Sequence, residues 1–247
     1  MIIAVSGKGG VGKTLVSALI VRCLAEEKKG SILAIDADPD ANLADALGVH
    51  AEKTIGDIRE GMSNAPLPPG VEKKAYLDSK VFEITAETGK FDFIEMGRPE
   101  GPGCYCAINH MLRDIVDNMS DAYDWVVIDC EAGLEHISRR TTKGADVMLI
   151  VTDASKKGFK TAGHIKAMSG NLGIKFNDIF LILNRVEDAN EKALNGMVKE
   201  TGIGEIGRIP NDKKVAQYDL AGRPLIDLPE DSKAYTGVKQ ILKLITR

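Results

Sequence analysis

One stretch near the start of the chain restricts its fold more than any other. Residues 7–14 read Gly-Lys-Gly-Gly-Val-Gly-Lys-Thr and lie between an apolar run at 2–5 and another at 15–20. This order predicts a buried strand, a glycine-rich loop and a helix, and it fits the phosphate-binding pattern G-x-x-x-x-G-K-[S/T]. Glycines let successive backbone N–H groups point at phosphate oxygens, and the start of the following helix adds its positive dipole end.

The side chains of this loop predict the chemistry of the ligand. Lys13 is placed to neutralise charge on β- and γ-phosphates, and the Thr14 hydroxyl is placed to ligate Mg²⁺. We therefore expect a bound nucleoside triphosphate or diphosphate together with Mg²⁺. The residues of this segment that are expected to contact the nucleotide are Gly7, Lys8, Gly9, Gly10, Val11, Gly12, Lys13, Thr14 and Leu15.

The rest of the chain has the composition of a globular protein. Its 247 residues are 44% hydrophobic and 28% charged, with a formal net charge of −4. There is no basic block and no apolar run long enough to span a bilayer, so neither nucleic acid nor a membrane is an expected partner. The chain runs straight into its first strand without a signal peptide, which predicts a cytoplasmic location. In that reducing compartment the four cysteines favour thiols or metal ligands over disulfides.

Apolar runs alternate with amphipathic stretches along the chain. This alternation predicts an α/β fold with a single doubly wound, mostly parallel sheet and helices on both faces. We expect one domain over residues 1–247 with an irregular insertion at about 48–80, where Gly and Pro are dense. The predicted helices cover 13–28, 53–60, 108–119, 158–171 and 232–247. The predicted strands after the first cover 31–35, 81–84, 91–96, 125–129, 147–152, 177–184 and a last strand that ends at 207–212.

Carboxylates follow two of the predicted strands. Asp36, Asp38 and Asp40 come after 31–35, and Asp129 ends 125–129. The carboxyl ends of parallel strands in a doubly wound sheet lie beside the phosphate loop. These side chains are therefore candidates to orient Mg²⁺-bound water and the attacking water. Capping of a helix over 41–47 is the alternative for the cluster, and it stays open for Asp40.

A glycine- and proline-rich loop at 97–103 leads to Cys104 and Cys106, ahead of the helix at 108–119. Cysteines two apart in extended backbone point to the same side, and a disulfide between them would close a strained ring. Two thiolates can bind a soft metal, but a closed site needs about four donors. Two chains related by a twofold axis would supply both cysteines twice, which predicts a homodimer holding Zn²⁺ or Ni²⁺. A pair of incidental thiols is the alternative.

Several motifs together resemble a known group of ATPases. The early lysine of K-G-G-V-G-K-T and the D-A-D-P run at 36–39 resemble the MinD/ParA and nitrogenase-iron-protein class. With G-P-G-C-Y-C-A at 101–107 and D-C-E-A-G-L-E-H at 129–136, the chain resembles the CooC family, whose members assist nickel insertion into carbon monoxide dehydrogenase, with a close relative serving acetyl-CoA synthase. The resemblance covers essentially the whole chain. It implies an ATP-hydrolysing metallochaperone that forms a nucleotide- and metal-dependent homodimer, with the metal on Cys104 and Cys106 of both subunits.

The resemblance also implies roles for single residues around the nucleotide. Lys8 would reach across the dimer to the partner's nucleotide, and Asp38 would position the attacking water. Together with Lys13 these are the predicted catalytic groups. Asp36 and Asp129 would bind Mg²⁺ through water, and Thr14 would bind it directly.

The end of the strand at 177–184 predicts the preferred base. A guanine-reading N-K-x-D pattern would need lysine at 185 and aspartate at 187, where the chain has Arg185 and Glu187. ATP is therefore favoured over GTP, and Asn184 can hydrogen-bond the amino edge of adenine. In the related family the loop after the last strand borders the adenine, which implies further base contacts from Arg185, Pro210 and Asn211.

Two other functions stay open. An iron–sulfur ATPase resembling the nitrogenase iron protein would need a cysteine downstream of the second switch, where His136 lies instead. A MinD/ParA-like positioning ATPase would need a membrane tail or a basic face. We expect the apolar stripe in 232–247 to pack on the core rather than on lipid. No role is assigned to Cys130, His136, Arg139 or Arg140.

Overall fold

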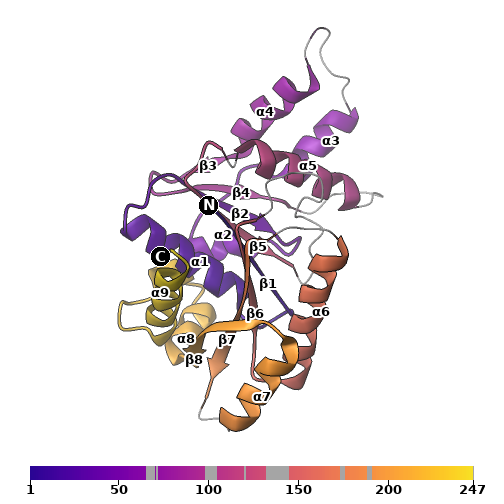
Figure 1. Cartoon of the computed structure of the whole chain (residues 1–247). Helices are drawn as coiled ribbons and strands as arrows, with labels where there is room; N and C mark the ends of the chain where they lie inside the picture. The colour runs from indigo at the N-terminus through magenta and orange to yellow at the C-terminus, as the bar shows by residue number, and fades with distance from the viewer. Residues whose placement is uncertain are drawn as a thin grey trace.

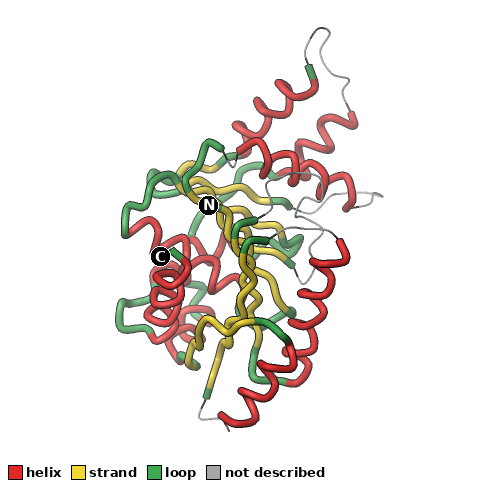
Figure 2. Tube along the Cα trace, viewed as in Figure 1, coloured by secondary structure: helices red, strands yellow, loops and turns green. Residues whose placement is uncertain are grey.

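The computed structural model of the chain describes residues 1–64, 70, 72–97, 105–119, 121–131, 145–172, 176–187 and 191–246. These residues form one eight-stranded sheet with helices on both faces (Figures 1 and 2). The strands are β1 Ile2–Gly7, β2 Ile32–Ala37, β3 Ala86–Glu87, β4 Asp92–Glu95, β5 Trp125–Cys130, β6 Val147–Thr152, β7 Asp178–Val186 and β8 Gly204–Pro210.

The strand order is β3-β4-β2-β5-β1-β6-β7-β8. Every neighbouring pair is parallel except the edge pair β3 and β4, which is antiparallel. The chain therefore starts in the middle of the sheet and builds outward on both sides. This arrangement confirms the predicted doubly wound, mostly parallel sheet. The phosphate loop follows β1 and therefore lies near the middle of the row of carboxyl ends of the strands.

The helices divide into two layers. Those described are α1 Lys13–Glu26, α2 Leu43–Leu47, α3 Ile55–Asn64, α4 Lys73–Ile84, α5 Tyr105–Met119, α6 Lys156–Leu172, α7 Glu191–Thr201, α8 Lys213–Leu220 and α9 Lys233–Ile245, with a 3₁₀ turn, η1, at Leu225–Asp227. Apolar residues of α1, α2 and α9 pack in one core cluster, and those of α3 to α7 pack in the other. Figure 1 shows these layers on opposite sides of the sheet.

Successive side chains of β1 point to opposite faces of the sheet, and both faces are covered by helices, so every position of the strand is buried. Ile3 and Val5 belong to the core on the α1 side, whereas Ile2 and Ala4 belong to the other core. A strand covered on both faces has no solvent face to keep polar. The same holds for β6, whose six residues are all buried.

The segment predicted as an irregular insertion contains two helices, α3 and α4. The predicted strand at 81–84 is wrong, because these residues form the last turn of α4. Val81 and Ile84 are buried while Phe82 is 75% exposed. A three-residue spacing between apolar side chains fits a helix, and a four-residue run is too short to separate it from a strand by pattern.

Helix α9 packs on α1 and β8, as the sequence predicts for this stripe. Val238, Ile241 and Leu242 are buried in the core on the α1 side. The Ser232 hydroxyl accepts a hydrogen bond from the Tyr235 N–H and caps the first turn. Within the described residues, no helix is both long enough and apolar enough to cross a bilayer.

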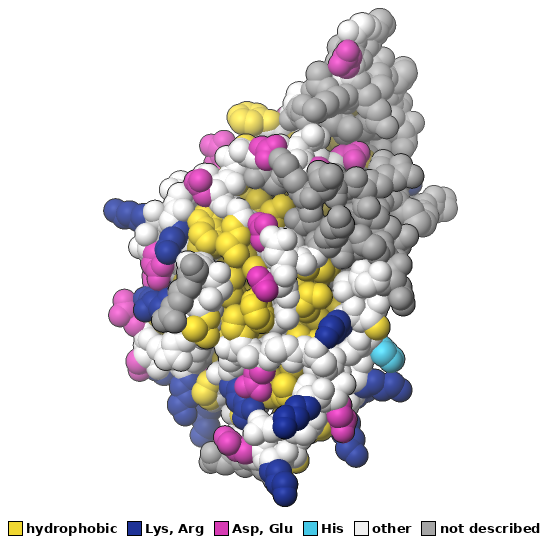
Figure 3. Space-filling model, in the orientation of Figure 1, with side chains coloured by type: hydrophobic (Ala, Val, Ile, Leu, Met, Phe, Trp, Pro, Cys, Tyr) yellow, Lys and Arg dark blue, Asp and Glu magenta, His cyan; other side chains and the backbone are white. Residues whose placement is uncertain are grey.

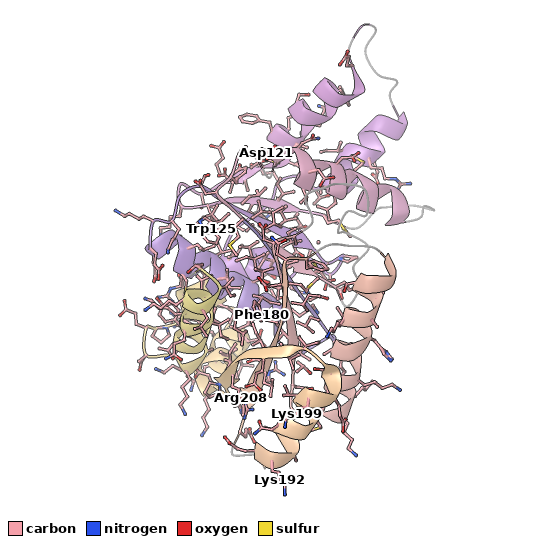
Figure 4. All side chains as sticks on the ribbon, viewed as in Figure 1. Asp121, Trp125, Phe180, Lys192, Lys199 and Arg208 are labelled. Carbon is pink, nitrogen blue, oxygen red and sulfur yellow. The ribbon has the colours of Figure 1, made fainter. Side chains whose placement is uncertain are left out.

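The edge of the sheet opposite the phosphate loop holds the amino ends of the strands. Trp125 starts β5 and Phe180 lies near the start of β7, as Figure 4 shows. On the face seen in Figure 3, lysine and arginine side chains are interspersed with aspartate and glutamate rather than gathered in one patch. This mixed surface agrees with the small net charge.

Candidate nucleotide site

A cavity of about 550 Å³ lies at the carboxyl edge of the sheet, beside the phosphate loop. It is lined by the loop, by the segment after β2, by the ends of β7 and β8, and by α8, η1 and the start of α9. The lining residues are Gly9, Gly10, Gly12, Lys13, Thr14, Leu15, Asp38, Asp40, Asn42, Asn184, Arg185, Pro210, Asn211, Asp212, Val215, Ala216, Asp219, Leu225 and Ala234. Most of the predicted nucleotide contacts are therefore brought together in one place.

Two glycines of the loop are required by their surroundings. Gly12 has a φ of 94°, and a Cβ there would lie 2.3 Å from the Asn184 Nδ2. A Cβ on Gly7 would lie 2.2 Å from the carbonyl oxygen of Val151. The loop is thus pressed against β6 and β7 at these two glycines, while Gly9 and Gly10 have no atom close to where a Cβ would lie and both line the cavity.

Asn184 has a structural task that the sequence did not reveal. Its side chain is 1% exposed; the Nδ2 donates to the carbonyl of Val11 over 2.8 Å, and the Oδ1 accepts from the Arg185 N–H over 2.9 Å. The amide thus ties the phosphate loop to the end of β7. The amide nitrogen and the amide oxygen of Asn184 each keep one further hydrogen-bonding position. The contact of Asn184 with adenine stays a prediction.

The Thr14 hydroxyl is oriented by a buried carboxylate. It donates to Asp129 over 2.7 Å, and the Ser17 hydroxyl donates to the other oxygen of Asp129 over 3.0 Å. Burial raises the pKa of Asp129 to about 6, while these two hydrogen bonds and nearby Lys13 oppose the rise. Because the only proton of Thr14 points at Asp129, its oxygen lone pairs are left for a cation, and the group fits Mg²⁺.

Asp36 lies beside Asp129 on the neighbouring strand and faces a different task. It is fully buried, and its carboxylate accepts from the N–H of Leu43 over 2.7 Å and of Asp38 over 3.0 Å. Burial and the charge of Asp129 raise the pKa of Asp36 to about 8. Asp36 thus organises the segment between β2 and α2 and is absent from the residues that line the cavity. Its water-mediated contact with Mg²⁺ stays a prediction.

Asp38 and Asp40 both line the cavity. The Asp38 Oδ1 accepts from the Asp40 N–H over 3.0 Å, which closes a tight turn. Helix α2 begins after Asn42 without a cap from the Asn42 side chain, and its first N–H donates to Asp36. Asp36 thus supplies the helix capping that was the alternative for this cluster, and the role of Asp40 stays a prediction. Asp38 therefore lies in the cavity wall, and its role in positioning the attacking water stays a prediction.

Lys13 and Lys8 differ in where they lie. Lys13 is 8% exposed and lines the cavity, so it faces the phosphate position directly. Lys8 is half-buried and is not among the residues that line the cavity. Of the two lysines of the loop, Lys13 lines this cavity and Lys8 does not.

The far end of the cavity is formed by residues that the sequence only partly identified. Arg185, Pro210 and Asn211 line it as predicted, and the Asn211 Nδ2 donates to Glu187 over 2.8 Å. Sequence reasoning missed a further set that comes from α8, η1, α9 and the residues just before α2 and α8, namely Asn42, Asp212, Val215, Ala216, Asp219, Leu225 and Ala234. One signal in the sequence could have indicated part of this set. The D-x-x-V spacing after Pro210 is typical of a helix start, and that helix follows the last strand directly.

The cysteines divide into two pairs. Cys23 and Cys130 are free and fully buried. Cys23 lies in the core on the α1 side of the sheet, and Cys130 lies in the core on the other side. Cys104 lies outside the described residues, as do His136, Arg139 and Arg140. Cys106 belongs to the first turn of α5, so the premise of extended backbone at both cysteines is wrong. Among described side chains, no group of three or more His, Cys, Asp or Glu is arranged to hold a metal.

The fold and the site define a P-loop ATPase. The glycine loop lies between a central parallel strand and a helix, and the buried Lys13 and the oriented Thr14 hydroxyl line the cavity beside it. This arrangement is typical of sites that bind phosphate and magnesium. Residues 2–225 match the CobQ/CobB/MinD/ParA nucleotide-binding domain family. The chain belongs to this family.

Similar proteins support the assignment. The chain is 50% identical to an uncharacterised ATP-binding protein of Methanocaldococcus jannaschii, over 99% of this chain and 98% of that one. It is 31% identical to the carbon monoxide dehydrogenase accessory protein CooC of Rhodospirillum rubrum, over 92% of this chain and 90% of that one.

Solved structures confirm the fold. The cell division ATPase MinD of Pyrococcus furiosus superposes with a TM-score of 0.73 at 22% identity, covering 99% of this chain and 98% of that one. MinD of Pyrococcus horikoshii, solved in complex with Mg-ADP, superposes with a TM-score of 0.72 at 21% identity, covering 100% of this chain and 96% of that one. At these identities the likeness speaks for the fold alone.

Proposed function

We propose that this ATPase is a metallochaperone that binds nickel or zinc between two subunits and assists nickel insertion into carbon monoxide dehydrogenase or acetyl-CoA synthase. The observation that carries the proposal is the C-x-C pair at Cys104 and Cys106 in a chain that resembles the CooC of Rhodospirillum rubrum across nearly its whole length. That relative is named as an accessory protein of carbon monoxide dehydrogenase. The metal would be its cargo, held and released, with ATP as the controlling ligand.

The chemistry of the four cysteines supports Cys104 and Cys106 as the metal donors. Thiolates, not thiols, bind metal. Burial raises the pKa of Cys23 to about 12 and the pKa of Cys130 still further, so both stay protonated inside the core. These two cannot turn toward a shared surface without unpacking the core. Only the C-x-C pair is then left to supply thiolates, and two copies of it give the four donors that tetrahedral zinc or planar nickel takes.

The position of Lys8 supports a nucleotide-dependent dimer. A second lysine in the phosphate loop is half-buried yet stands outside the cavity of its own subunit. A cation there is free to meet phosphate charge on a facing subunit, which would join the two loops through two nucleotides. ATP would then favour the closed dimer because it carries the γ-phosphate that the partner's Lys8 contacts, and hydrolysis would weaken that contact.

The residues of the cavity fit the hydrolytic half of this cycle. Bound Mg²⁺ supplies charge stabilisation at the β- and γ-phosphates. Thr14 would hold it with an oxygen whose proton is committed to Asp129, Lys13 would neutralise phosphate charge, and Asp38 would orient water from the cavity wall. The metal is released when the dimer reopens, so slow turnover is sufficient for such a switch. We place this cycle in the cytoplasm.

The test measures metal content and oligomeric state together, with and without ATP. We expect about one nickel or zinc ion per dimer, from the four-donor geometry, and loss of the metal in Cys104→Ser/Cys106→Ser. The matched control is Cys23→Ala/Cys130→Ala, which removes the same number of thiols from the core and should keep the metal. Unchanged metal content in the Cys104→Ser/Cys106→Ser variant would reject the interface site.

The second candidate is a MinD-like positioning ATPase, favoured by the fold and by the MinD structures it superposes on. Such a protein works on a surface, so it needs a face to attach by. The apolar side of α9 is already buried against α1 and β8 and is not available to lipid. Sedimentation with anionic liposomes in ATP distinguishes the two, because only the positioning ATPase would pellet with them. An iron–sulfur ATPase would instead show visible absorption after anaerobic reconstitution.

A further inference from the structure

Asp212 lies in the wall of the nucleotide cavity, and its carboxylate is occupied by groups of the protein itself. The Oδ1 accepts from the Lys214 N–H over 2.9 Å. The Oδ2 accepts from the Ser232 hydroxyl over 2.7 Å and from the Ala234 N–H over 3.2 Å. One side chain therefore caps the first turn of α8 and holds the first turn of α9 at the same time.

These hydrogen bonds outweigh the cost of placing the carboxylate there. Burial raises the pKa of Asp212, but the hydrogen bonds from Ser232, Lys214 and Ala234 leave the pKa below its ordinary value. Ser232 is itself fully buried and caps α9 through the Tyr235 N–H. The chain of contacts runs from α8 through Asp212 and Ser232 into a helix that is packed on α1 and β8.

The two helices that Asp212 joins each supply a surface to the cavity. Val215 and Ala216 of α8 line it, and Ala234 of α9 lines it beside them. The glycine loop at the other end is where phosphates bind, so this end receives the nucleoside. Small apolar side chains suit the flat faces of a base, which are satisfied by packing rather than by hydrogen bonds.

We infer that Asp212 is a positioning residue for the nucleoside half of ATP, acting by fixing α8 and α9 so that Val215, Ala216 and Ala234 form the wall on which the base packs. The inference rests on ATP binding and is independent of the cargo metal. It assigns Asp212 no contact with the phosphates and no part in hydrolysis.

The variant Asp212→Asn tests this role with little change in size. An amide offers one accepting oxygen and an NH₂ group, so one of the two helix starts would meet a donor where it now meets an acceptor. We expect the dissociation constant for Mg-ADP and the KM for ATP to rise about tenfold, since one hydrogen bond to a charged group is lost. We expect kcat to stay within about twofold and the affinity for Mg-pyrophosphate, which has no base, to stay unchanged.

The matched control is Asp124→Asn. Asp124 also orders a turn, because its Oδ2 accepts from the N–H and the hydroxyl of Ser31, but it does so before β5 at the opposite edge of the sheet. Its Mg-ADP affinity should equal that of the unmodified chain. Equal weakening in both variants would show general destabilisation and overturn the inference.

Two results with Asp212→Asn would also overturn it. One is Mg-ADP affinity within about twofold of the unmodified chain in a folded variant; the other is parallel weakening of Mg-ADP and Mg-pyrophosphate. If Asp212→Asn does not fold, Ser232→Ala serves in its place, since it removes one of the three donors and leaves the carboxylate. It should weaken Mg-ADP more than Mg-pyrophosphate, and equal losses would contradict the proposed role.

Discussion

Glycine is needed at position 12 for two reasons, its positive φ and the closeness of the Asn184 side chain. A pair of substitutions can separate the two. Gly12→Ala adds a Cβ at a φ of 94°, and that atom would lie 2.3 Å from the Asn184 Nδ2. The positive φ costs an alanine about 1–2 kcal/mol. Forcing the amide aside adds about 1–3 kcal/mol of overpacking. We therefore expect Gly12→Ala to lower the free energy of unfolding by about 3 kcal/mol in total.

The second substitution is Asn184→Ala, which completes a double-mutant cycle with Gly12→Ala. It removes the hydrogen bonds to the Val11 carbonyl and the Arg185 N–H. Leaving these backbone groups unpaired should cost about 1–3 kcal/mol. The shortened side chain, however, no longer occupies the space that a Cβ on Gly12 would enter. In the Asn184→Ala background, Gly12→Ala should therefore cost only the strain of its positive φ, about 1–2 kcal/mol.

Urea unfolding of the four proteins without nucleotide measures this coupling. The double variant should be more stable than the sum of the single effects by about 1–3 kcal/mol. Additivity within about 0.5 kcal/mol would refute the steric part of the argument and leave the φ of Gly12 as the sole reason for glycine. Equal slopes of unfolding free energy against urea are needed for the comparison to hold.

Three further predictions concern other parts of the molecule. The pKa of Asp36 is raised from 3.8 to about 8 in the fold, so the folded state keeps a proton that the unfolded state loses. Stability should fall as pH rises between about 4 and about 8, seen as a declining urea midpoint that flattens in Asp36→Asn. Tyr235→Phe removes the 2.5 Å hydrogen bond to Glu26 and should cost about 1 kcal/mol, measured by thermal unfolding; no change would exclude that bond as a stabilising contact. Lys8→Ala should keep Mg-ADP binding by calorimetry but abolish ATP-dependent dimerisation by light scattering, and a dimer that persists would contradict the role of Lys8.

Much of the fold could be predicted from the sequence because its elements carry strong local signals. The strands β1, β5 and β6 are apolar runs bounded by turns, and the glycine loop fixes which strand is central. Helix α9 shows an apolar stripe at helical spacing, and its burial follows. These are features that depend on neighbours close in sequence.

The parts that were missed depend on partners far along the chain. The contact of Asn184 with the base stays a prediction, but the hydrogen bond from its amide to the Val11 carbonyl, 173 positions away, could not be predicted. The contact of Asp36 with magnesium through water also stays a prediction, but the hydrogen bond that its carboxylate accepts at the start of α2 could not be predicted. The Asp212 carboxylate caps α8 and also accepts a hydrogen bond from Ser232, twenty residues later, at the start of a second helix. Sequence spacing identifies the polar residues at a strand end. It does not show which of their side chains are already hydrogen-bonded to the protein's own backbone.

The cavity also has a consequence for how the protein is made. Its lining starts at Gly9 and ends at Ala234, so the two ends of one ligand site are separated by most of the chain. A ribosome delivers the phosphate loop first, and the last wall of the base pocket follows only when Ala234 has been made. A partly synthesised chain can therefore offer phosphate-binding groups but not a complete nucleotide pocket. Tight ATP binding then begins only when β8, α8 and α9 have been added to the sheet, and it cannot stabilise shorter nascent chains.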